Sequence, residues 1–170
     1  MCRAGAAVVI TGRDPGSLRQ ARDELLDLRA GVCAMTMDST DQASVEAAVV
    51  AVETAFGPLD ALVNIADVAC PTGPVWEVDQ DDWWRAVEVN LRGTALTIAA
   101  VLARMVPRKK GRIVTVVSHA GGDRATACSV AKAAVIELTE GGRGDARTWH
   151  HGAELPPRIG GPRCRRYAGC

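Results

Sequence analysis

Four short apolar runs alternate with helical stretches over the first 140 residues, and this alternation constrains the fold more than any other feature of the sequence. Runs of about four to eight apolar residues fit strands that are buried on both faces, as in a parallel sheet. The runs expected as strands are Ala6–Thr11, Val32–Met37, Leu59–Asn64 and Ile113–Val117. Because a helical pattern follows each run, we expect an α/β fold with a Rossmann-like, doubly wound, mostly parallel sheet.

Capping residues indicate where the helices begin and end. Asp14, Asp41 and Asp79 each precede a stretch of helical spacing and are expected to cap it. Gly57 is expected to end the second helix and Pro107 the third. The two later helices are expected over residues 80–106 and 129–140.

The composition fits one globular domain rather than a fibre or a membrane protein. Hydrophobic residues make up 48% of the 170 residues and charged residues 24%, which is enough to build a core. The longest apolar stretches are shorter than the roughly 20 residues that a membrane-spanning helix needs, and the first residues lack the layout of a secretory signal. We therefore expect a cytoplasmic chain that makes no membrane contact.

The six cysteines are scattered along the chain, at Cys2, Cys33, Cys70, Cys128, Cys164 and Cys170. The sequence has no Cys-x-x-Cys pair, which argues against a zinc ribbon and against a redox dithiol, so reduced thiols are expected. His150 and His151 are adjacent, and adjacent histidines rarely bind one metal ion together. No metal site is expected.

Residues 141–170 differ in kind from the rest of the chain. They hold seven glycines and three prolines, and six arginines against two acidic residues give them a net charge of +4. This tail is expected to be disordered, because it cannot bury enough apolar surface to offset its ordering entropy. Its arginines lack interleaved aromatic residues, so nucleic-acid binding is not expected. The composition raises the hypothesis that the tail is translated in a shifted reading frame.

The segment Gly111–Lys132 joins an expected strand, a hydroxyl and a helix that carries a lysine. Ser118 comes at the carboxyl end of the strand, and Lys132 lies on the first turns of the following helix. Open α/β sheets bind ligands beyond the carboxyl ends of their strands. Both side chains are therefore expected to face one cleft.

This segment resembles the active-site region of the short-chain dehydrogenase/reductase family. In that family a serine closes a central strand, and a Tyr-x-x-x-Lys pair opens the next helix. The resemblance implies that Ser118 and Lys132 are catalytic and that Cys128 stands at the position of the tyrosine. Asn90 matches the family's helix asparagine, which holds a water in a proton relay. A buried structural amide is the alternative for Asn90.

The cysteine matters because the family's tyrosine donates the proton when a hydride is transferred to a carbonyl. The sulfur of Cys128 lies one bond beyond Cβ, so it is expected to fall several ångströms short of the reach of about 2.6–3.2 Å that a proton donor needs. The resemblance implies an oxidoreductase acting on a small carbonyl or secondary alcohol, with catalysis by this chain in doubt. The alternative is a non-catalytic remnant that associates with intact family members.

The resemblance also implies a nucleotide site. Arg13 follows the first expected strand, where the family reads the adenosine ribose, and an arginine there fits the 2′-phosphate of NADP better than NAD. Asp38 resembles the aspartate that meets the adenine, and its alternative is a plain turn residue. The stretch Thr11–Leu18 suggests the family's phosphate loop, but Leu18 replaces its last glycine. We therefore interpret the first run as the family's second strand.

A second group of cofactor residues follows the third expected strand. Asn64 and Ala66 match two of the four positions in the family's Asn-Asn-Ala-Gly turn, and Asp67 replaces its glycine. A carboxylate at this position is expected to weaken binding of an anionic cofactor if it points inward. Lys132 is expected to contact the cofactor as well.

The resemblance covers roughly residues 3–140, which it implies is a partial Rossmann-like dinucleotide-binding domain ahead of the tail 141–170. The family's first strand and its last strands are missing, so the chain is expected to be truncated at its start and diverged at its end. In the order 3-2-1-4-5-6 the first strand lies in the middle of the sheet. The remaining strands are expected either to close up or to stay apart with exposed edges, at marginal stability.

Two helices are expected to form an interface. Helices 80–106 and 129–140 make up much of the subunit interface in the family, so the resemblance implies a homo- or hetero-oligomer. The tryptophans Trp76, Trp83 and Trp84 are expected to pack in the core or under loops rather than to form a stacking platform.

Overall fold

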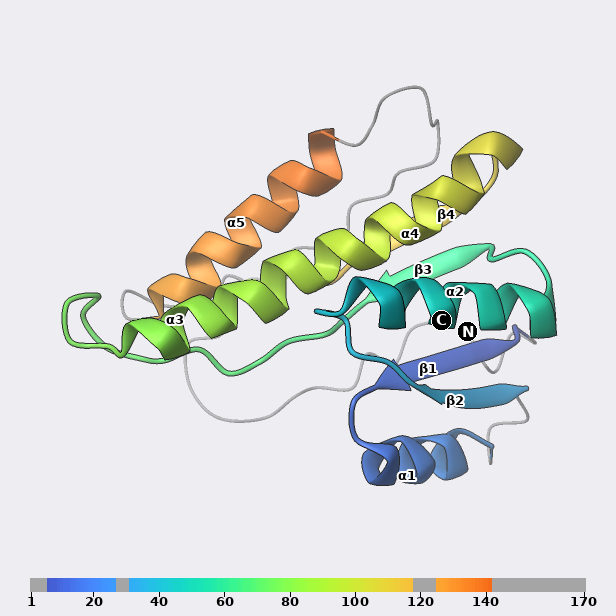
Figure 1. Cartoon of the computed structure of the whole chain (residues 1–170), viewed down its shortest axis with the longest axis horizontal. Coiled ribbons are helices and arrows are strands. Elements are labelled where there is room, and N and C mark those ends of the chain that lie inside the picture. Colours follow the sequence, from blue (N-terminus) through green and yellow to red (C-terminus); the bar gives the residue numbers. More distant parts are fainter. Residues whose placement is uncertain (1–5, 27–30, 118–124, 142–170) are drawn as a thin grey trace.

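The computed structural model describes residues 6–26, 31–117 and 125–141 (Figure 1). Strands and helices alternate as the sequence predicts. The elements are β1 (Val8–Gly12), α1 (Pro15–Leu26), β2 (Val32–Thr36), α2 (Gln42–Phe56), β3 (Ala61–Asn64), α3 (Gln80–Val87), the π-helical turn η2 (Glu88–Arg92), α4 (Gly93–Arg108), β4 (Arg112–Thr115) and α5 (Thr126–Gly141).

The four strands form two separate parallel pairs rather than one sheet. β1 pairs with β2, with Val8 opposite Val32, and β3 pairs with β4, with Ala61 opposite Arg112. The Rossmann-like α/β fold with an incomplete parallel sheet is thus confirmed. Of the two arrangements expected around the missing strand, the chain adopts the one in which the pairs stay apart. No ladder joins β1 to β3.

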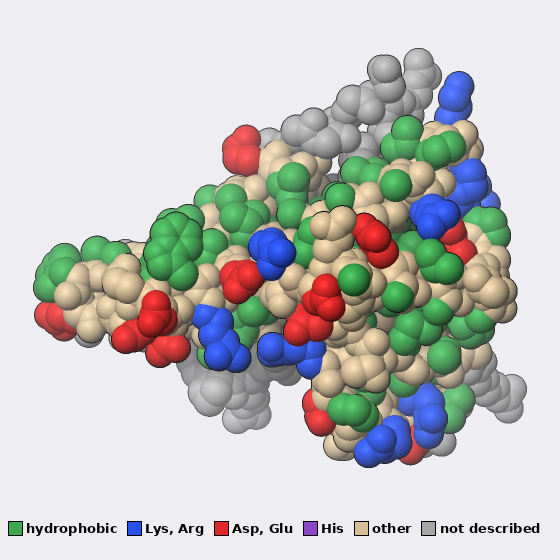
Figure 2. All heavy atoms as spheres, viewed as in Figure 1, with side chains coloured by type: hydrophobic (Ala, Val, Ile, Leu, Met, Phe, Trp, Pro, Cys, Tyr) green, Lys and Arg blue, Asp and Glu red, His purple; other side chains and the backbone are tan. Residues whose placement is uncertain are grey.

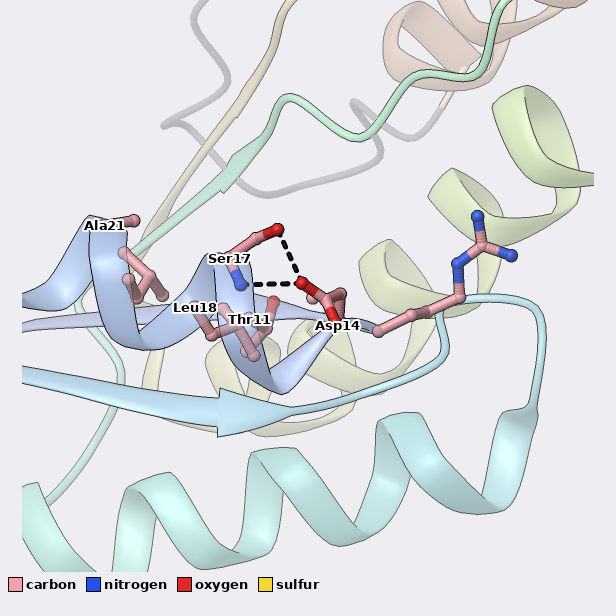
Figure 3. A pocket seen from close by; sticks show the side chains of 8 residues that line it. Thr11, Asp14, Ser17, Leu18 and Ala21 are labelled. Carbon is pink, nitrogen blue, oxygen red and sulfur yellow. Dashed lines mark hydrogen bonds between the residues drawn. The ribbon is translucent and has the colours of Figure 1, made fainter.

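Helices lie on both sides of the first strand pair, as in a doubly wound fold. In Figures 1 and 3 the β1–β2 pair lies between α1 and α2. α2 packs against α4, and α4 packs against β3. α5 lies beside the long helical stretch and contacts α3, η2 and α4. The carboxyl ends of the strands therefore face the region where α5 meets η2.

The main hydrophobic core lies between α2, α4 and β4. Its buried members are Val49, Ile98, Val101, Met105 and Ile113. Ile113 is 1% exposed, so β4 contributes a fully buried side chain to this core. A smaller cluster joins α3 to α5 through Ala86, Val87 and Ala127, and it packs together the helices that flank Asn90 and Cys128. By contrast, the residues of β1 are only half-buried or exposed.

The predicted helix caps are confirmed. The Asp14 carboxylate accepts hydrogen bonds from the Ser17 backbone N–H and hydroxyl, both at 2.6 Å. These two bonds hold the pKa of Asp14 below its ordinary value. Asp41 accepts from the Ala43 N–H, and Asp79 accepts from the Asp82 N–H. Each carboxylate satisfies a backbone donor that the helix itself leaves free.

Two helix ends differ from the prediction. Pro107 does not stop α4, which ends one residue later at Arg108 and is followed by Lys109 in a left-handed conformation, φ 51°. A proline in the last turn costs little there, because few hydrogen bonds remain to be broken. α5 starts at Thr126 instead of residue 129, because Thr126 and Ala127 already pack against α3.

The helices α3, η2 and α4 form one continuous helical stretch, Gln80–Arg108. It has 29 residues, and a mean hydropathy of 1.3 in its most apolar 18-residue window makes it long and apolar enough to cross a membrane by length and composition alone. In the fold, 44% of its most apolar window is buried inside the protein, against α2 and α5. Burial of this kind also explains the composition, because core helices are apolar for the same reason.

The tryptophan expectation is wrong for two of the three residues. Trp83 is half-buried and donates from its indole Nε1 to the Thr126 hydroxyl at 2.9 Å. Trp76 is 80% exposed and Trp84 is 63% exposed. The helical period places Trp83 toward α5, so the next residue on α3, Trp84, points to solvent.

Candidate active site

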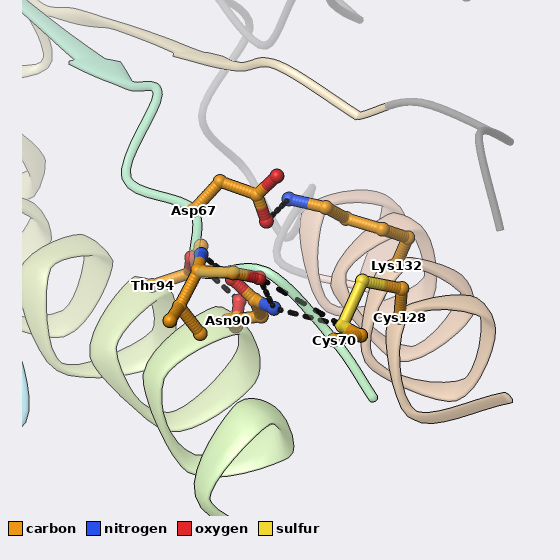
Figure 4. A network of polar contacts seen from close by, with 7 residues as sticks. Asp67, Cys70, Asn90, Thr94, Cys128 and Lys132 are labelled. Carbon is orange, nitrogen blue, oxygen red and sulfur yellow. Dashed lines mark hydrogen bonds and ion pairs between the residues drawn. A yellow bond between two sulfur atoms is a disulfide. The ribbon is translucent and has the colours of Figure 1, made fainter. Parts of the chain in front are cut away.

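Asn90 lies at the centre of the candidate site, in the π-helical turn between α3 and α4. Its side chain is completely buried. Its Oδ1 accepts from the Val68 N–H at 3.1 Å, and its Nδ2 donates to the Val68 carbonyl at 3.3 Å (Figure 4). The widened turn, a feature often found at functional sites, carries this amide. Asn90 therefore fixes the backbone of the loop that follows β3.

Lys132 reaches toward the same loop from α5. Its Nζ lies 3.2 Å from Oδ1 of Asp67, and the lysine side chain is 12% exposed against 53% for the aspartate. Figure 4 shows the Asp67 carboxylate directed at Lys132. Asp67, the residue that departs from the family's glycine, therefore neutralises the lysine charge expected to act in catalysis.

Cys128 forms a disulfide with Cys70, so the expectation of reduced thiols is wrong for this pair. The two cysteines are 58 positions apart in sequence, and their Cα atoms lie 5.8 Å apart, within the usual range for a disulfide. The pairing was not predicted because only the fold brings the loop after β3 against α5. Among the described cysteines, Cys33 is the free one.

Two polar side chains at the carboxyl ends of β3 and β4 have unsatisfied atoms. Asn64 and Thr115 are opposite each other in the strand register. The Asn64 Oδ1 accepts from the Thr97 hydroxyl at 2.9 Å, but Asn64 Nδ2 and Thr115 Oγ1 are buried without a hydrogen-bond partner. A buried unsatisfied polar atom costs about 1–3 kcal/mol, so these atoms mark a place where a polar ligand or water would be stabilising.

A separate hollow lies beyond the carboxyl end of β1. Its volume is about 790 Å³, and residues of β1, the following turn and α1 line it, including Thr11, Gly12, Arg13 and Ser17 (Figure 3). Arg13 is exposed there. The hollow adjoins the N-terminus of α1, whose Ser17 N–H is already bonded to the Asp14 carboxylate, so Arg13 is the cationic group among the residues that line it.

Asp38 lies close to this hollow and also acts as a turn residue. Its carboxylate accepts from the Thr40 N–H at 2.9 Å and from the Thr40 hydroxyl at 2.7 Å. These bonds, with a smaller contribution from the positive charge of Arg13, hold the pKa of Asp38 below its ordinary value. Gly12 and Thr36 are opposite each other at the carboxyl ends of β1 and β2, so Arg13 and Asp38 follow neighbouring strand ends.

The fold thus gathers the predicted residues into two groups. Asn90, Lys132 and Cys128 meet at the loop after β3, whereas Arg13 and Asp38 follow the paired ends of β1 and β2. Asn64 lies at the end of β3, and Ala66 is exposed in the loop after it. Gly141 is the last residue of α5, and Ser118, the rest of the predicted tail (142–170) and the histidine–cysteine set predicted not to bind metal lie outside the described residues. Within the described residues no cluster of side chains is suited to a metal ion.

Sequence reasoning missed three residues of this site. Cys70 bonds to Cys128, and the hydroxyls of Thr97 and Thr115 lie beside Asn64. No local pattern identifies Cys70, whose partner is distant in sequence. Thr115 could have been found as the polar residue that interrupts an otherwise β-branched apolar strand.

Comparison with known proteins decides the family. The family described as short chain dehydrogenase matches residues 1–150, beyond the residues 3–140 in which the motifs lie. The chain belongs to the short-chain dehydrogenase family. Its general class is therefore that of family oxidoreductases with a Rossmann-like fold.

The short-chain dehydrogenase relatives are longer than this chain. The protein named inactive 2-(S)-hydroxypropyl-CoM dehydrogenase 2 of Xanthobacter autotrophicus is 39% identical over 141 residues, which are 81% of this chain and 59% of that protein. This chain therefore spans about three fifths of that relative's length.

Solved structures of short-chain dehydrogenases have the same arrangement. A variant of actinorhodin polyketide ketoreductase with NADPH is 31% identical, with a TM-score of 0.74 over 79% of this chain and 53% of that one. NAD⁺-bound xylitol dehydrogenase is 26% identical, with a TM-score of 0.83 over 89% of this chain and 62% of that one. One of these proteins holds NADPH and the other NAD⁺, so the comparison leaves the nucleotide open.

Proposed function

We propose that this chain is an NADP(H)-binding short-chain dehydrogenase whose hydride transfer, between the cofactor and a small carbonyl or secondary alcohol, is suppressed. The observation that carries the proposal is the pair of bonds that occupy the catalytic positions. Cys128 is bonded to Cys70, and Lys132 is paired with Asp67. The Cys128 sulfur has no proton to donate in the disulfide, and the Lys132 ammonium is engaged by the Asp67 carboxylate.

Features at two places support a nucleotide fit. Arg13 presents a positive charge at the hollow beyond β1, which suits the 2′-phosphate of NADP. The unsatisfied Asn64 Nδ2 and Thr115 Oγ1 would gain partners from polar groups at the strand ends. When bound, the cofactor supplies or accepts the hydride.

The chain's own residues would then orient the substrate and transfer the proton. Asn90 holds the loop after β3 through Val68, and Lys132 is placed on α5 beside that loop. Ser118 is the predicted group that polarises the substrate oxygen. Proton donation is the step for which the chain has no suitable residue, because the Cys128 sulfur is bonded to the Cys70 sulfur. Use of NADP over NAD and a cytoplasmic location stay predictions.

Binding and turnover test this function separately. NADPH binding, followed by quenching of tryptophan fluorescence, is expected to weaken at least tenfold in Arg13→Glu. Arg19→Glu, on α1 six residues after Arg13 but not among the residues that line the hollow, is the matched control and is expected to bind as the unmodified chain does. Equal NADPH affinity in both variants would contradict the nucleotide assignment.

Turnover is expected to be near background in the unmodified chain and to rise when Cys128→Tyr is combined with Cys70→Ser. The tyrosine restores the proton donor of the family, and the serine avoids a stray thiol. A panel of small carbonyls with NADPH measures this change. High turnover by the unmodified chain would contradict the proposed suppression.

Exposed apolar side chains favour a second function, that of a non-catalytic partner of intact relatives. Trp84, Val106, Val130 and Leu138 are all more than a third exposed on α3, α4 and α5. Figure 2 shows hydrophobic side chains at the surface along these helices. The relative named as inactive belongs to the same family, so loss of activity has a precedent there. Co-purification with a full-length relative, lost in Trp84→Glu with Val130→Glu, would support this role.

A further inference from the structure

Two bonds of different kinds join the same two segments at the candidate site. Asp67 and Cys70 come from the loop after β3, three residues apart, and Lys132 and Cys128 come from α5, four residues apart. Residues four apart on a helix lie on one face, one turn above the other. The disulfide and the ion pair are therefore adjacent links between the loop and α5 (Figure 4).

Val68, one of the two residues between the links, is held by the π-helical turn η2. Val68 exchanges two hydrogen bonds with the buried amide of Asn90, whose Nδ2 also lies 3.6 Å from the Cys70 sulfur. The loop backbone is thus clamped between η2 and α5. A change at Cys70 would be transmitted directly to Asp67, because only two residues separate them.

The ion pair alone is too weak to fix this geometry. The Asp67 side chain is 53% exposed, and pairs of this kind compete with water and with the entropy of a long lysine side chain. The disulfide closes the loop covalently next to the pair, so it keeps the carboxylate within reach of the Lys132 ammonium. The disulfide therefore determines how often Lys132 is paired.

We propose that Cys70 and Cys128 are a reversible thiol–disulfide site that controls the availability of Lys132. In the oxidised form Asp67 is held on Lys132, and in the reduced form the loop is released and the lysine is freed. Both cysteines are only half-buried, which leaves the sulfurs open to attack by a small thiol. The inference concerns the geometry of these four residues and does not depend on cofactor binding or turnover.

The exchange balances with a dithiol as reductant. A thiolate of the dithiol attacks one sulfur of the Cys70–Cys128 bond, forming a mixed disulfide and releasing the other cysteine as a thiolate that takes up a proton. The second thiol of the reagent then displaces the remaining cysteine. The reagent ends as a cyclic disulfide, and both protein cysteines end as thiols. Oxidation by a small disulfide reverses this exchange: the two cysteines lose two electrons and two protons, and the small disulfide is reduced to two thiols.

Dithiothreitol and mass spectrometry test the redox site directly on the full chain. In the untreated protein, iodoacetamide is expected to modify Cys33 but not Cys70 or Cys128, and after reduction it is expected to modify all three. Oxidised glutathione should then restore the protection of the pair. Modification of Cys70 and Cys128 in the untreated protein at the rate of Cys33 would overturn the proposal.

The availability of Lys132 is measured by pulse labelling with an amine-reactive ester, with exposed Lys109 as the internal reference. Reduction is expected to raise the labelling rate of Lys132 by about two- to fivefold, the scale of a partly exposed ion pair. Asp67→Asn is expected to raise it in the oxidised protein, where reduction then adds little. Cys33→Ser is the matched control and is expected to leave the redox response intact.

The serine pair Cys70→Ser with Cys128→Ser should label as the reduced chain does, whatever reagent is added. Circular dichroism in parallel establishes that reduced and variant chains keep their helices, so that labelling reports the local contact. An unchanged Lys132 rate on reduction of the folded chain, together with a raised rate in Asp67→Asn, would overturn the control of the lysine by the disulfide.

Discussion

The two strand pairs differ in how well they are supported. The N-terminal unit, β1, α1 and β2, has Leu18, which is 9% exposed, as its one buried apolar side chain within the described residues. The C-terminal unit, α2 through α5, contains both hydrophobic clusters, the disulfide and the buried Asn90. Both units are built from the same alternation of strand and helix, so the local pattern does not explain the difference.

The difference in burial arises from the helices and side chains that cover each strand pair. Every described strand keeps one edge without a ladder partner, but β3 and β4 are covered by α4 and the core around Ile113, whereas β1 has no buried side chain. A parallel strand normally needs neighbours on both sides and cover on both faces. The incomplete sheet therefore concentrates stability in the unit that holds the catalytic positions and leaves the nucleotide hollow in the weaker unit.

Reduction of the disulfide is expected to have the largest effect, and only on the C-terminal unit. In the chain-entropy account, releasing a closed loop of 58 residues lowers the free energy of unfolding by up to about 4 kcal/mol. Urea unfolding with and without dithiothreitol measures the loss. A loss below about 1 kcal/mol would indicate that the packing of α5, and not the covalent link, holds the catalytic positions.

Core substitutions compare the two units directly. Ile113→Ala is expected to cost about 3 kcal/mol, because the side chain is 1% exposed and its loss leaves a cavity. Ile10→Ala on half-buried β1 is the matched substitution and is expected to cost about 1 kcal/mol. Urea midpoints of the two variants measure both values. Equal losses would contradict the contrast between the strand pairs.

Acidification is expected to lower the free energy of unfolding slightly, through the loss of the Asp38 charge beside the N-terminal unit. The pKa of Asp38 is lowered in the folded chain by its bonds to Thr40 and, to a smaller extent, by the Arg13 charge. The stabilisation is therefore present above the unfolded pKa and is lost as pH falls through the folded one. Urea unfolding from about pH 6 down to about pH 3 is expected to show a shallower decline in Asp38→Asn than in the unmodified chain. An identical decline would count against a stabilising role for this carboxylate.

Much of the fold could be predicted from the sequence because its signals are local. Each predicted strand overlaps an observed one, and Asp41 caps α2 as expected. The separation of the strand pairs was one of two predicted outcomes. The extent of the long helix was predicted within two residues at its end, because its apolar face repeats with the helical period.

The candidate site was less predictable because its decisive contacts are distant in sequence. Asn90, Lys132 and Cys128 were identified by resemblance, and their catalytic roles stay predictions. The partners that define their state, Cys70 and Asp67, come from a loop with no regular pattern. Periodicity places residues on a face of an element but does not specify which face meets which loop.

Amide hydrogen exchange on the oxidised chain tests the central contrast most directly. The amides of β1 and β2 are expected to exchange through local opening, with protection at least tenfold below that of β4 and α4, because so little apolar surface holds the first strand pair closed. Equal protection in both strand pairs, lost together at one denaturant concentration, would contradict the account and would establish a single cooperative sheet.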